Sequence, residues 1–253
     1  MTASFAPRHA VVTGGARGIG RAIAARLSRD GMTVTILGRN AEALAQAVAE
    51  GAAHHAVPLD VTDEAAVARA FAEIAARAPV DILVANAGAA ESAPFGRSDA
   101  ALFRRMLDVN LFGAVHAAHA VLPGMTERGF GRIVAIASTA GQKGYPYVSA
   151  YCAAKHAVVG LVRSLAQETA RHGITVNAVC PGFTDTDIVG DSLERIMATT
   201  GRDREAALAS LVRHNPQGRL VRPDEVADAV AWLCGAGAAA VTGQVVTVAG
   251  GEL

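Results

Sequence analysis

Cysteine is scarce in this sequence of 253 residues, and neither sign of charge is in excess. Cys152, Cys180 and Cys234 are odd in number, far apart and never in a Cys-x-x-Cys arrangement, so neither a disulfide framework nor a zinc knuckle is predicted. Lys plus Arg equals Asp plus Glu at 23 each, so no net field favours nucleic acid or an anionic membrane. We therefore expect reduced, mostly buried cysteines and no nucleic-acid partner.

Long apolar runs are also absent. Hydrophobic residues make up 51% of the chain, yet no uninterrupted run reaches the ~20 residues that a helix needs to cross a bilayer. The N-terminal stretch contains Pro7 and Arg8 and lacks the continuous apolar core of a secretory signal. The sequence therefore predicts a cytoplasmic protein without a membrane-spanning segment.

Short β-branched runs alternate with longer stretches of helical period, which is typical of a parallel sheet with helices on both faces. The predicted strands are Ala10–Thr13, Thr33–Leu37, His55–Pro58, Ile82–Ala85, Gly131–Ala137, Thr175–Val179 and Gln244–Val248. The predicted helices are Gly18–Arg29, Ala41–Glu50, Glu64–Arg77, Leu102–Glu127, Ala150–His172 and Pro223–Leu233. No linker or repeat interrupts this order, so we expect one doubly wound (Rossmann) α/β domain over residues 1–253, with about seven parallel strands.

One segment departs from this rhythm. From residue 183 to about 218 the chain is longer than an ordinary strand-to-helix loop, with a short helical patch at Arg204–Val212. Insertions of this kind in α/β enzymes are commonly binding loops or lids. We predict that this insertion forms part of a substrate pocket.

A glycine-rich turn follows the first predicted strand and opens the first predicted helix. Its residues Gly14, Arg17, Gly18, Ile19 and Gly20 belong to a Gly-x-x-x-Gly-x-Gly spacing. Glycines let the backbone approach a diphosphate, and a helix start offers free N–H groups and a positive dipole end. No Lys-Ser/Thr pair follows, so a P-loop nucleotide triphosphatase is disfavoured. The turn predicts a dinucleotide site.

The choice of dinucleotide is expected at the end of the second strand, where NAD-specific folds place an acid on the adenosine ribose. This position reads Leu37-Gly38-Arg39-Asn40 and contains no acid. Arg39 can instead pair with a 2′-phosphate, and Arg17 could reach the same group. NADP(H) is favoured, while NAD(H) stays possible.

Three further residues predict acid/base chemistry. Tyr151 and Lys155 are four apart in a helical stretch, and Ser138 ends the preceding strand thirteen residues before Tyr151. A phenol can protonate a carbonyl oxygen, but its unperturbed pKa of ~10 makes the reverse step slow at neutral pH. We expect Lys155 to lower the pKa of Tyr151, because an ammonium favours phenolate, and Ser138 to hold the carbonyl oxygen.

Together these residues resemble the short-chain dehydrogenase/reductase family, of the type that includes 3-oxoacyl-carrier-protein reductases and polyketide ketoreductases. The resemblance spans nearly the whole chain. It rests on Thr13 to Gly20, Asp60-Val61, Asn86-Ala87-Gly88, Asn110, Ser138, Tyr151, Lys155, and Pro181-Gly182 with Thr184 and Thr186. Ala85 departs from the family, which often has a second asparagine at that position.

The resemblance implies a role for each matching position. Asp60 and Val61 would hold the adenine, and Asn86, Ala87 and Gly88 would support the adenosine side. Asn110 would fix a water that links Lys155 to a proton relay, and both Tyr151 and Lys155 would contact the nicotinamide ribose side. The last set of implied cofactor contacts is Pro181, Gly182, Thr184 and Thr186. The resemblance also implies a homotetramer or homodimer.

The predicted activity is reduction of a ketone, a β-ketoacyl thioester or a cyclic ketone, by NADPH. Two alternatives stay open: an NAD-dependent alcohol or 3-hydroxyacyl-CoA dehydrogenase, and a catalytically silent dinucleotide-binding sensor or scaffold. His116 and His119 lie three apart, but no carboxylate or cysteine is placed to complete a ligand set, so no metal is predicted.

Overall fold

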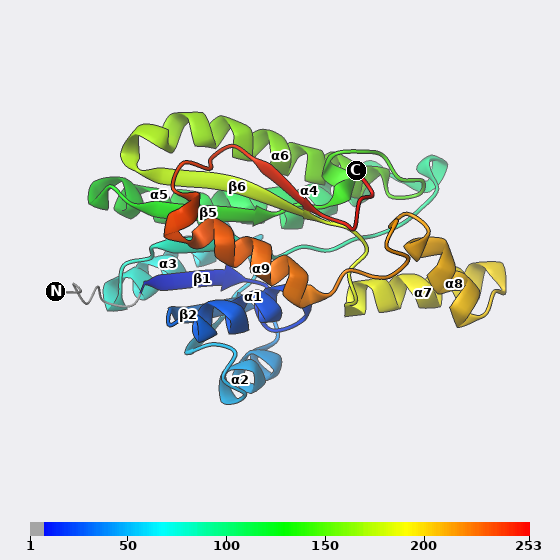
Figure 1. Ribbon diagram of the computed structural model, residues 1–253, viewed down its shortest axis with the longest axis horizontal. Coiled ribbons are helices and arrows are strands. Elements are labelled where there is room, and N and C mark those ends of the chain that lie inside the picture. Colours follow the sequence, from blue (N-terminus) through cyan, green and yellow to red (C-terminus); the bar gives the residue numbers. More distant parts are fainter. Residues whose placement is uncertain (1–7) are drawn as a thin grey trace.

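The computed structural model describes residues 8–253, without the side chains of residues 188 and 191. Its centre is one seven-stranded, all-parallel sheet in the order β3-β2-β1-β4-β5-β6-β7 (Figure 1). The strands are β1 His9–Thr13, β2 Thr33–Gly38, β3 His55–Pro58, β4 Ile82–Ala85, β5 Gly131–Ile136, β6 Ile174–Pro181 and β7 Val245–Val248. The predicted doubly wound α/β fold is confirmed.

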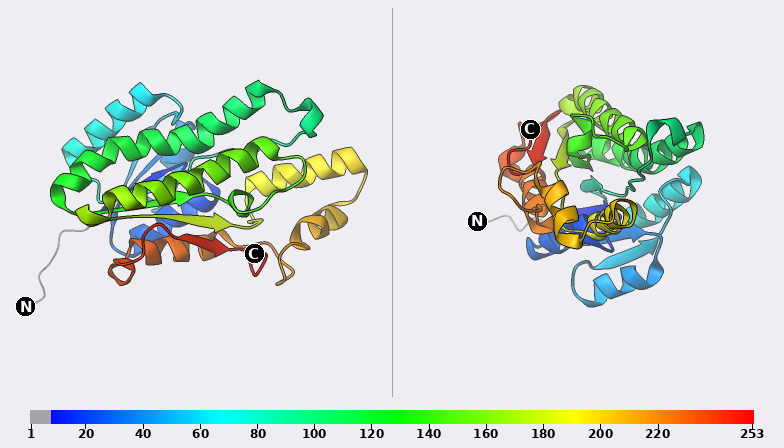
Figure 2. Two further views of the ribbon diagram at one scale, coloured as in Figure 1. Left: turned by 90° about the horizontal axis from the view of Figure 1, so that it is seen from above. Right: turned by 90° about the vertical axis from the view of Figure 1, so that its right-hand side faces the viewer.

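Helices cover both faces of the sheet (Figure 2). On one face lie α1 Gly18–Arg29, α2 Ala41–Ala49 and α9 Pro223–Cys234; on the other lie α3 Glu64–Arg77, α5 Gly113–Arg128 and α6 Ser149–Thr169. Successive side chains of a strand point to opposite faces of the sheet, so Val12 packs with the first group of helices and Val11 with the second. Among the described residues, no helix is both long and apolar enough to span a membrane.

The predicted helix over residues 102–127 is continuous but contains an irregular turn. It comprises α4 Ala100–Leu107, a π-helical segment Asp108–Phe112 and then α5. Asn110 lies in the π-helical segment and is buried. Single π-helical turns inside α-helices are frequent at functional sites.

The insertion over residues 183–218 contains more helix than the sequence predicts. The patch Arg204–Val212 is confirmed as α8, but α7 Asp187–Thr200 precedes it. Val189 and Leu193, four residues apart on α7, pack against Ala207 and Leu211 of α8, so each helix covers the apolar stripe of the other. Figure 1 shows this pair at one end of the molecule, beyond the carboxyl ends of the strands.

Candidate active site

The strand order reverses between β1 and β4, which are neighbours in the sheet, and the glycine-rich turn lies at this point. Thr13 ends β1, and its hydroxyl accepts hydrogen bonds from the backbone N–H groups of Asn86 and Ala87, both at 3.0 Å. The amide of Asn86 donates to the carbonyl oxygens of Thr13 and Gly14, at 2.9 and 3.1 Å. These contacts fasten the turn to the segment after β4, at the position where open α/β sheets bind ligands.

The backbone of the turn leaves no room for side chains at two predicted positions. Gly14 has φ of +66°, which side-chain-bearing residues rarely adopt. A Cβ on Gly20 would lie 2.2 Å from the carbonyl oxygen of Gly14. These glycines are therefore required by the fold of the turn itself.

Helix α1 begins at Gly18, followed by Ile19, and its first turn is uncapped. The residue before it, Arg17, makes no side-chain cap, and the first turn carries no acid, whereas α2 and α3 are capped by Asn40 and Asp63. The free N–H groups and the positive dipole end fit a diphosphate. This observation indicates that the residues present suit a dinucleotide cofactor.

Arg17 has a partner that the sequence did not reveal. Its Nη1 lies 3.4 Å from Oδ2 of Asp187, the first residue of α7, and both side chains are mostly exposed. A Cβ on Gly18 would lie 3.3 Å from the side chain of Thr186, just before Asp187. The turn is thus in contact with the start of the insertion.

Arg39 and Asp60 lie near each other at the ends of β2 and β3. Thr62 donates twice to Oδ1 of Asp60, from its backbone N–H at 3.0 Å and from its hydroxyl at 2.8 Å, and these bonds, with the charge of Arg39, hold the pKa of Asp60 low. Val61 is buried, and its carbonyl oxygen lies 3.0 Å from Nδ1 of His116. Arg39 is exposed and available to a ligand.

Gly88 is the point at which two predicted catalytic residues meet. A Cβ built there would lie 2.6 Å from Oδ1 of Asn110 and 3.5 Å from Nζ of Lys155. The side-chain amide of Asn110 donates to the carbonyl oxygens of Ala89, at 2.9 Å, and Met106, at 3.0 Å. Since Asn110 also accepts from the N–H of Ala89 at 3.3 Å, its orientation is fixed.

Ser138, Tyr151 and Lys155 converge at the carboxyl end of β5. Ser138 lies close enough to Tyr151 for its hydroxyl to lower the pKa of the phenol. Lys155 is only 4% exposed, and its Nζ lies 5.7 Å from the ring centre of Tyr151. With Asn110 and Gly88, the structure brings together all four residues that the sequence predicts to be catalytic.

The pKa of Tyr151 differs from the sequence-based expectation. Burial raises it to about 12, although the hydrogen bond from Ser138 opposes this rise. Lys155 does not bring it back to its usual value: the Nζ of Lys155 donates to the carbonyl oxygen of Ile136 at 2.8 Å, and burial lowers the pKa of Lys155 itself to about 8. In the protein alone, therefore, Tyr151 is a protonated phenol rather than a phenolate.

The segment after β6 leads from the sheet into the insertion. Pro181 ends β6, and the N–H of Gly182 donates to the carbonyl oxygen of Val248 at 3.0 Å. Thr184 is buried and donates from its hydroxyl to the carbonyl oxygen of Gly182. The hydroxyl of Thr186 in turn donates to the backbone carbonyl oxygen of Thr184. The backbone is thereby folded tightly between the sheet and α7.

Two arginines make contacts with the loop after β4 that the sequence did not predict. Arg195 of α7 donates to the hydroxyl of Ser92 at 2.6 Å, and Arg105 of α4 makes two hydrogen bonds to Glu91. Residues 91 and 92 belong to the loop between β4 and α4, so the contact of Arg195 joins the insertion to that loop and the contact of Arg105 joins α4 to it. No motif in the sequence indicates either pair: Ser92 and Arg195 are 103 positions apart, and Glu91 and Arg105, 14 positions apart, lie on a loop and a helix.

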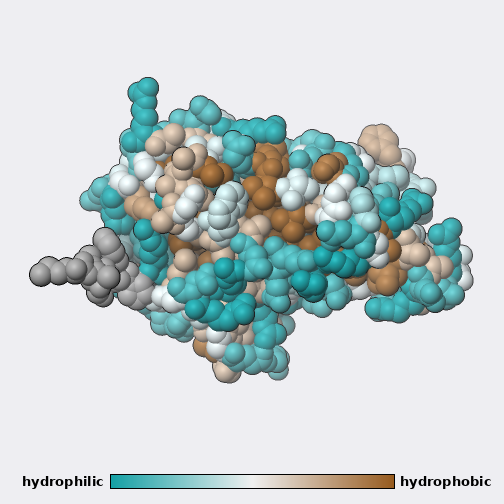
Figure 3. Space-filling view, viewed as in Figure 1, coloured by the Kyte–Doolittle hydropathy of each residue, from teal (hydrophilic) through white to brown (hydrophobic). Residues whose placement is uncertain are grey.

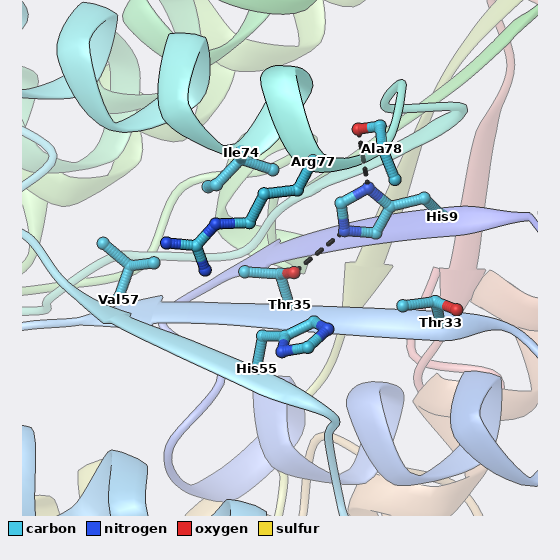
Figure 4. Close-up of a pocket in the computed structure, with 8 residues that line it drawn as sticks. All are labelled: His9, Thr33, Thr35, His55, Val57, Ile74, Arg77 and Ala78. Carbon is cyan, nitrogen blue, oxygen red and sulfur yellow. Dashed lines mark hydrogen bonds between the residues drawn. The ribbon is translucent and has the colours of Figure 1, made fainter.

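A small cavity near the amino-terminal ends of β1, β2 and β3 is separate from this site (Figure 4). It has a volume of about 110 Å³ and is lined by His9, Thr33, Thr35, His55, Val57, Ile74, Arg77 and Ala78. His9, Thr33 and His55 are the first residues of their strands, whereas the predicted site follows the last ones. The cavity is therefore remote from the glycine turn.

The chain is similar to known proteins of one family. The sequence model of the short chain dehydrogenase family matches residues 8–196. The chain is 40% identical to cis-4-hydroxycyclohexanecarboxylate dehydrogenase of Sinomonas cyclohexanicum, covering 99% of this chain and 98% of the relative. It is 37% identical to acetoacetyl-CoA reductase of Rhizobium meliloti, covering 97% and 98%.

A solved structure is similar over nearly the whole fold. It is a variant of actinorhodin polyketide ketoreductase with NADPH, which matches with a TM-score of 0.93 and 38% identity over 97% of each chain. Members of the family bind a nicotinamide dinucleotide, and the uncapped helix and glycine turn described above suit one. The chain belongs to the short-chain dehydrogenase family and is an oxidoreductase.

Proposed function

We propose that this oxidoreductase uses NADPH to reduce a ketone, either a β-ketoacyl thioester or a cyclic ketone, to a secondary alcohol, with Tyr151 as the proton donor. The observation that carries the proposal is the convergence of Ser138, Tyr151, Lys155 and Asn110 beside the glycine turn. The relatives named for acetoacetyl-CoA and polyketide reduction support the substrate class.

In this proposal each side chain has a separate task. A bound nicotinamide supplies the hydride. Tyr151 is protonated over the physiological range, because its pKa is raised to about 12, and it donates to the carbonyl oxygen. Ser138 holds the same oxygen, and the ammonium of Lys155 stabilises the phenolate that forms when the proton leaves. Asn110 would hold the water that links Lys155 to a proton relay.

For the cofactor, we propose contacts along the whole edge from β1 to β6. Gly14, Arg17, Gly18, Ile19 and Gly20 would face the diphosphate, and Asp60, Val61, Asn86, Ala87 and Gly88 the adenosine. Arg39 would pair with the 2′-phosphate, which favours NADP(H) over NAD(H). Pro181, Gly182, Thr184 and Thr186 would line the nicotinamide end.

The NAD-dependent oxidative reaction is the second candidate. It is favoured by the relative that is named as the dehydrogenase of a hydroxycyclohexane carboxylate, a cyclic secondary alcohol. The same four residues can run the reaction in either direction, because an acid in one direction is the base in the other. Only the cofactor and the substrate distinguish the two.

We also propose that residues 1–253 work as one domain whose insertion, 183–218, binds substrate, in a cytoplasmic homotetramer or homodimer. Three buried, free cysteines suit a reducing compartment. β7 is an edge strand with half-buried side chains, and Figure 3 shows apolar surface on the face of the molecule viewed in Figure 1. Trp232 of α9 is also exposed, and covering such surface favours association.

The test is absorbance at the reduced-nicotinamide band, with NADPH and NADH in parallel, against ketones, cyclic diketones and β-ketoacyl thioesters. Consumption of NADPH with a thioester or cyclic ketone supports the proposal. Turnover only with NADH, or only from alcohols, favours the oxidative candidate. No turnover with any compound favours a silent dinucleotide-binding protein.

A further inference from the structure

The residues after β7 form a tail that folds back onto the active-site side of the sheet. Gly250 and Gly251 both have positive φ, and a Cβ on Gly250 would lie 1.9 Å from Oδ1 of Asn215. The turn directs the side chain of Glu252 inward, where it is only 1% exposed.

The buried carboxylate of Glu252 has two partners on the loop that precedes α6. Oε1 lies 3.0 Å from Nζ of Lys143 and accepts a hydrogen bond from the hydroxyl of Tyr145. Because the single phenol proton goes to the carboxylate, the hydroxyl of Thr139 donates to the oxygen of Tyr145, at 2.7 Å. Thr139 directly follows Ser138, so the network ends beside a predicted catalytic residue.

The ring of Tyr145 connects this network to the insertion. Its centre lies 6.0 Å from that of Phe183 and 5.9 Å from that of His214, both at edge-to-face angles. Phe183 and His214 stack on each other, and they lie near the two ends of the 183–218 segment. Tyr145 is therefore in contact with both ends of the predicted substrate-binding insertion.

Glu252 also lies against the segment proposed to line the nicotinamide end. A Cβ on Gly182 would come within 3.2 Å of Oε2 of Glu252. A buried ion pair contributes little net stability compared with apolar packing, so stability alone is a weak reason for a buried carboxylate here. The carboxylate of Glu252 instead fixes the position of Tyr145 through a charged, directional hydrogen bond.

We propose that Glu252 is a positioning residue for substrate selection, which acts through Tyr145 to hold Phe183 and His214 at a set distance from Ser138. This inference rests on the proposed ketone reduction. The tail thus keeps Tyr145, Phe183 and His214 in one arrangement. Without the contact to Glu252 these rings should no longer be held together, so a bulky ketone that packs against them should bind more weakly, while the chemistry at Tyr151 is nearly unchanged.

The test compares Glu252→Ala, Glu252→Gln and Tyr145→Phe with the wild type, using a small and a bulky ketone. Glu252→Ala should raise KM for the bulky ketone about tenfold relative to the small one, with kcat and the Kd for NADPH nearly unchanged. Glu252→Gln retains an acceptor for Tyr145, so its effect should be intermediate. Glu42→Gln, at an exposed position of α2, is the matched control.

A double-mutant cycle separates positioning from a general loss of stability. In the Tyr145→Phe background, Glu252→Ala should have almost no further effect on the KM ratio, because both changes cut the same connection. If Glu252→Ala does not fold, Glu252→Gln and Tyr145→Phe carry the same comparison. Additive effects, or an unchanged KM ratio in an active enzyme, would overturn the inference and leave the proposed function intact.

The composition offers a second readout that does not depend on turnover. The chain has three tyrosines, Tyr145, Tyr147 and Tyr151, so labelled ring carbons give three assignable NMR signals. Glu252→Gln should shift the signal of Tyr145 and leave that of Tyr151 in place. An unmoved Tyr145 signal contradicts the contact on which the inference depends. A wild type that reduces no ketone overturns the proposed function, and the inference about selection with it.

Discussion

Lys155 lies one helical turn after Tyr151, yet its Nζ donates to the carbonyl oxygen of Ile136 at 2.8 Å and stands 5.7 Å from the tyrosine ring. The ammonium is therefore hydrogen-bonded to the end of β5 while it lies near the phenol ring. Because it is buried without a carboxylate partner in the described part of the chain, its pKa is lowered to about 8. The charge of Lys155 is thus sensitive to mildly alkaline pH.

This sensitivity predicts the pH profile of reduction. As pH rises through about 8, Lys155 loses its proton and no longer stabilises the phenolate that forms on Tyr151, so the rate should fall. Tyr151 itself stays protonated, because its pKa lies near 12. We would measure kcat/KM for NADPH, which reports the free enzyme. A rate that stays flat to pH 10 would contradict the assigned pKa of Lys155.

Tyr151→Phe tests the proton donor. The change removes one hydroxyl and keeps the ring, so ketone reduction should slow by at least about 100-fold while NADPH binding is nearly retained. Stopped-flow or steady-state loss of NADPH absorbance measures the first effect, and fluorescence titration the second. Tyr147→Phe, an exposed tyrosine nearby, should leave the rate unchanged. Substantial residual turnover in Tyr151→Phe would remove the role given to this residue.

Arg39→Ala tests the choice of cofactor. Loss of a charge-assisted contact with the 2′-phosphate should weaken NADPH binding by about 10- to 100-fold and leave NADH binding unchanged. Arg17→Ala should cost less, because Arg17 is already paired with Asp187 in an exposed position. Calorimetric titration of both variants with NADPH and with NADH measures these changes in affinity. An equal loss for NADPH and NADH would place Arg39 on the shared part of the cofactor.

Gly20→Ala tests the glycine turn. The added methyl would meet the carbonyl oxygen of Gly14 at 2.2 Å, so the turn must shift. We expect a loss of stability of about 1–3 kcal/mol and weaker NADPH binding. Gly237→Ala, where the Cβ meets nothing within 4 Å, is the control for a change of glycine alone. Thermal unfolding and cofactor titration measure the two effects, and an unchanged Gly20→Ala variant would show that the turn is adaptable.

The buried His9, at the start of β1, should make the free energy of unfolding depend on pH. Its Nδ1 lies 3.2 Å from the carbonyl oxygen of Ala78, so that nitrogen carries the hydrogen and Nε2 accepts from Thr35. Burial lowers the pKa of His9 below 6.5. As pH falls below about 6.5, the unfolded chain takes up a proton that the folded chain resists, so stability falls by at most about 1.4 kcal/mol per pH unit.

The measurement is urea unfolding at intervals from pH 7.5 to 5. His9→Gln should flatten the slope of the unfolding free energy against pH, because its amide does not titrate. His172→Gln, at an exposed position, should leave the slope as it is. An unchanged slope in His9→Gln would mean that the imidazole takes up its proton as readily in the folded protein as in the unfolded chain.

The sequence predicts most of the sheet because its signals are local. The runs of β-branched residues that end at Thr13 and Ala85 form buried strands, and each is bounded by a turn of recognisable composition. α7 was missed because Gly190 and several polar residues weaken its helical pattern, and its apolar stripe is covered by α8, a partner that lies later in the chain. Tertiary packing, not propensity, makes this helix.

The candidate site was likewise predictable only where its signals are local in the sequence. Tyr151 and Lys155 are predictable because four residues on a helix place them on one face. The pairs Arg17–Asp187, Arg195–Ser92 and Tyr145–Glu252 join residues about 100 or more positions apart, and no period or motif connects them. Likewise, the raised pKa of Tyr151 depends on its burial in the fold, which the spacing alone leaves undetermined.

The π-helical segment at residues 108–112 also joins two stretches of helix whose apolar faces pack against different partners. Leu102 and Met106 before it pack with α6, whereas Val121 and Met125 after it pack over the sheet with α3 and β5. A π-helical turn closes with i→i+5 hydrogen bonds and therefore takes up one residue more than an α-helical turn. A one-residue deletion here would let the helix close as a regular α-helix, which keeps Val121 and Met125 against the sheet but removes the irregular turn that holds Asn110 beside Lys155.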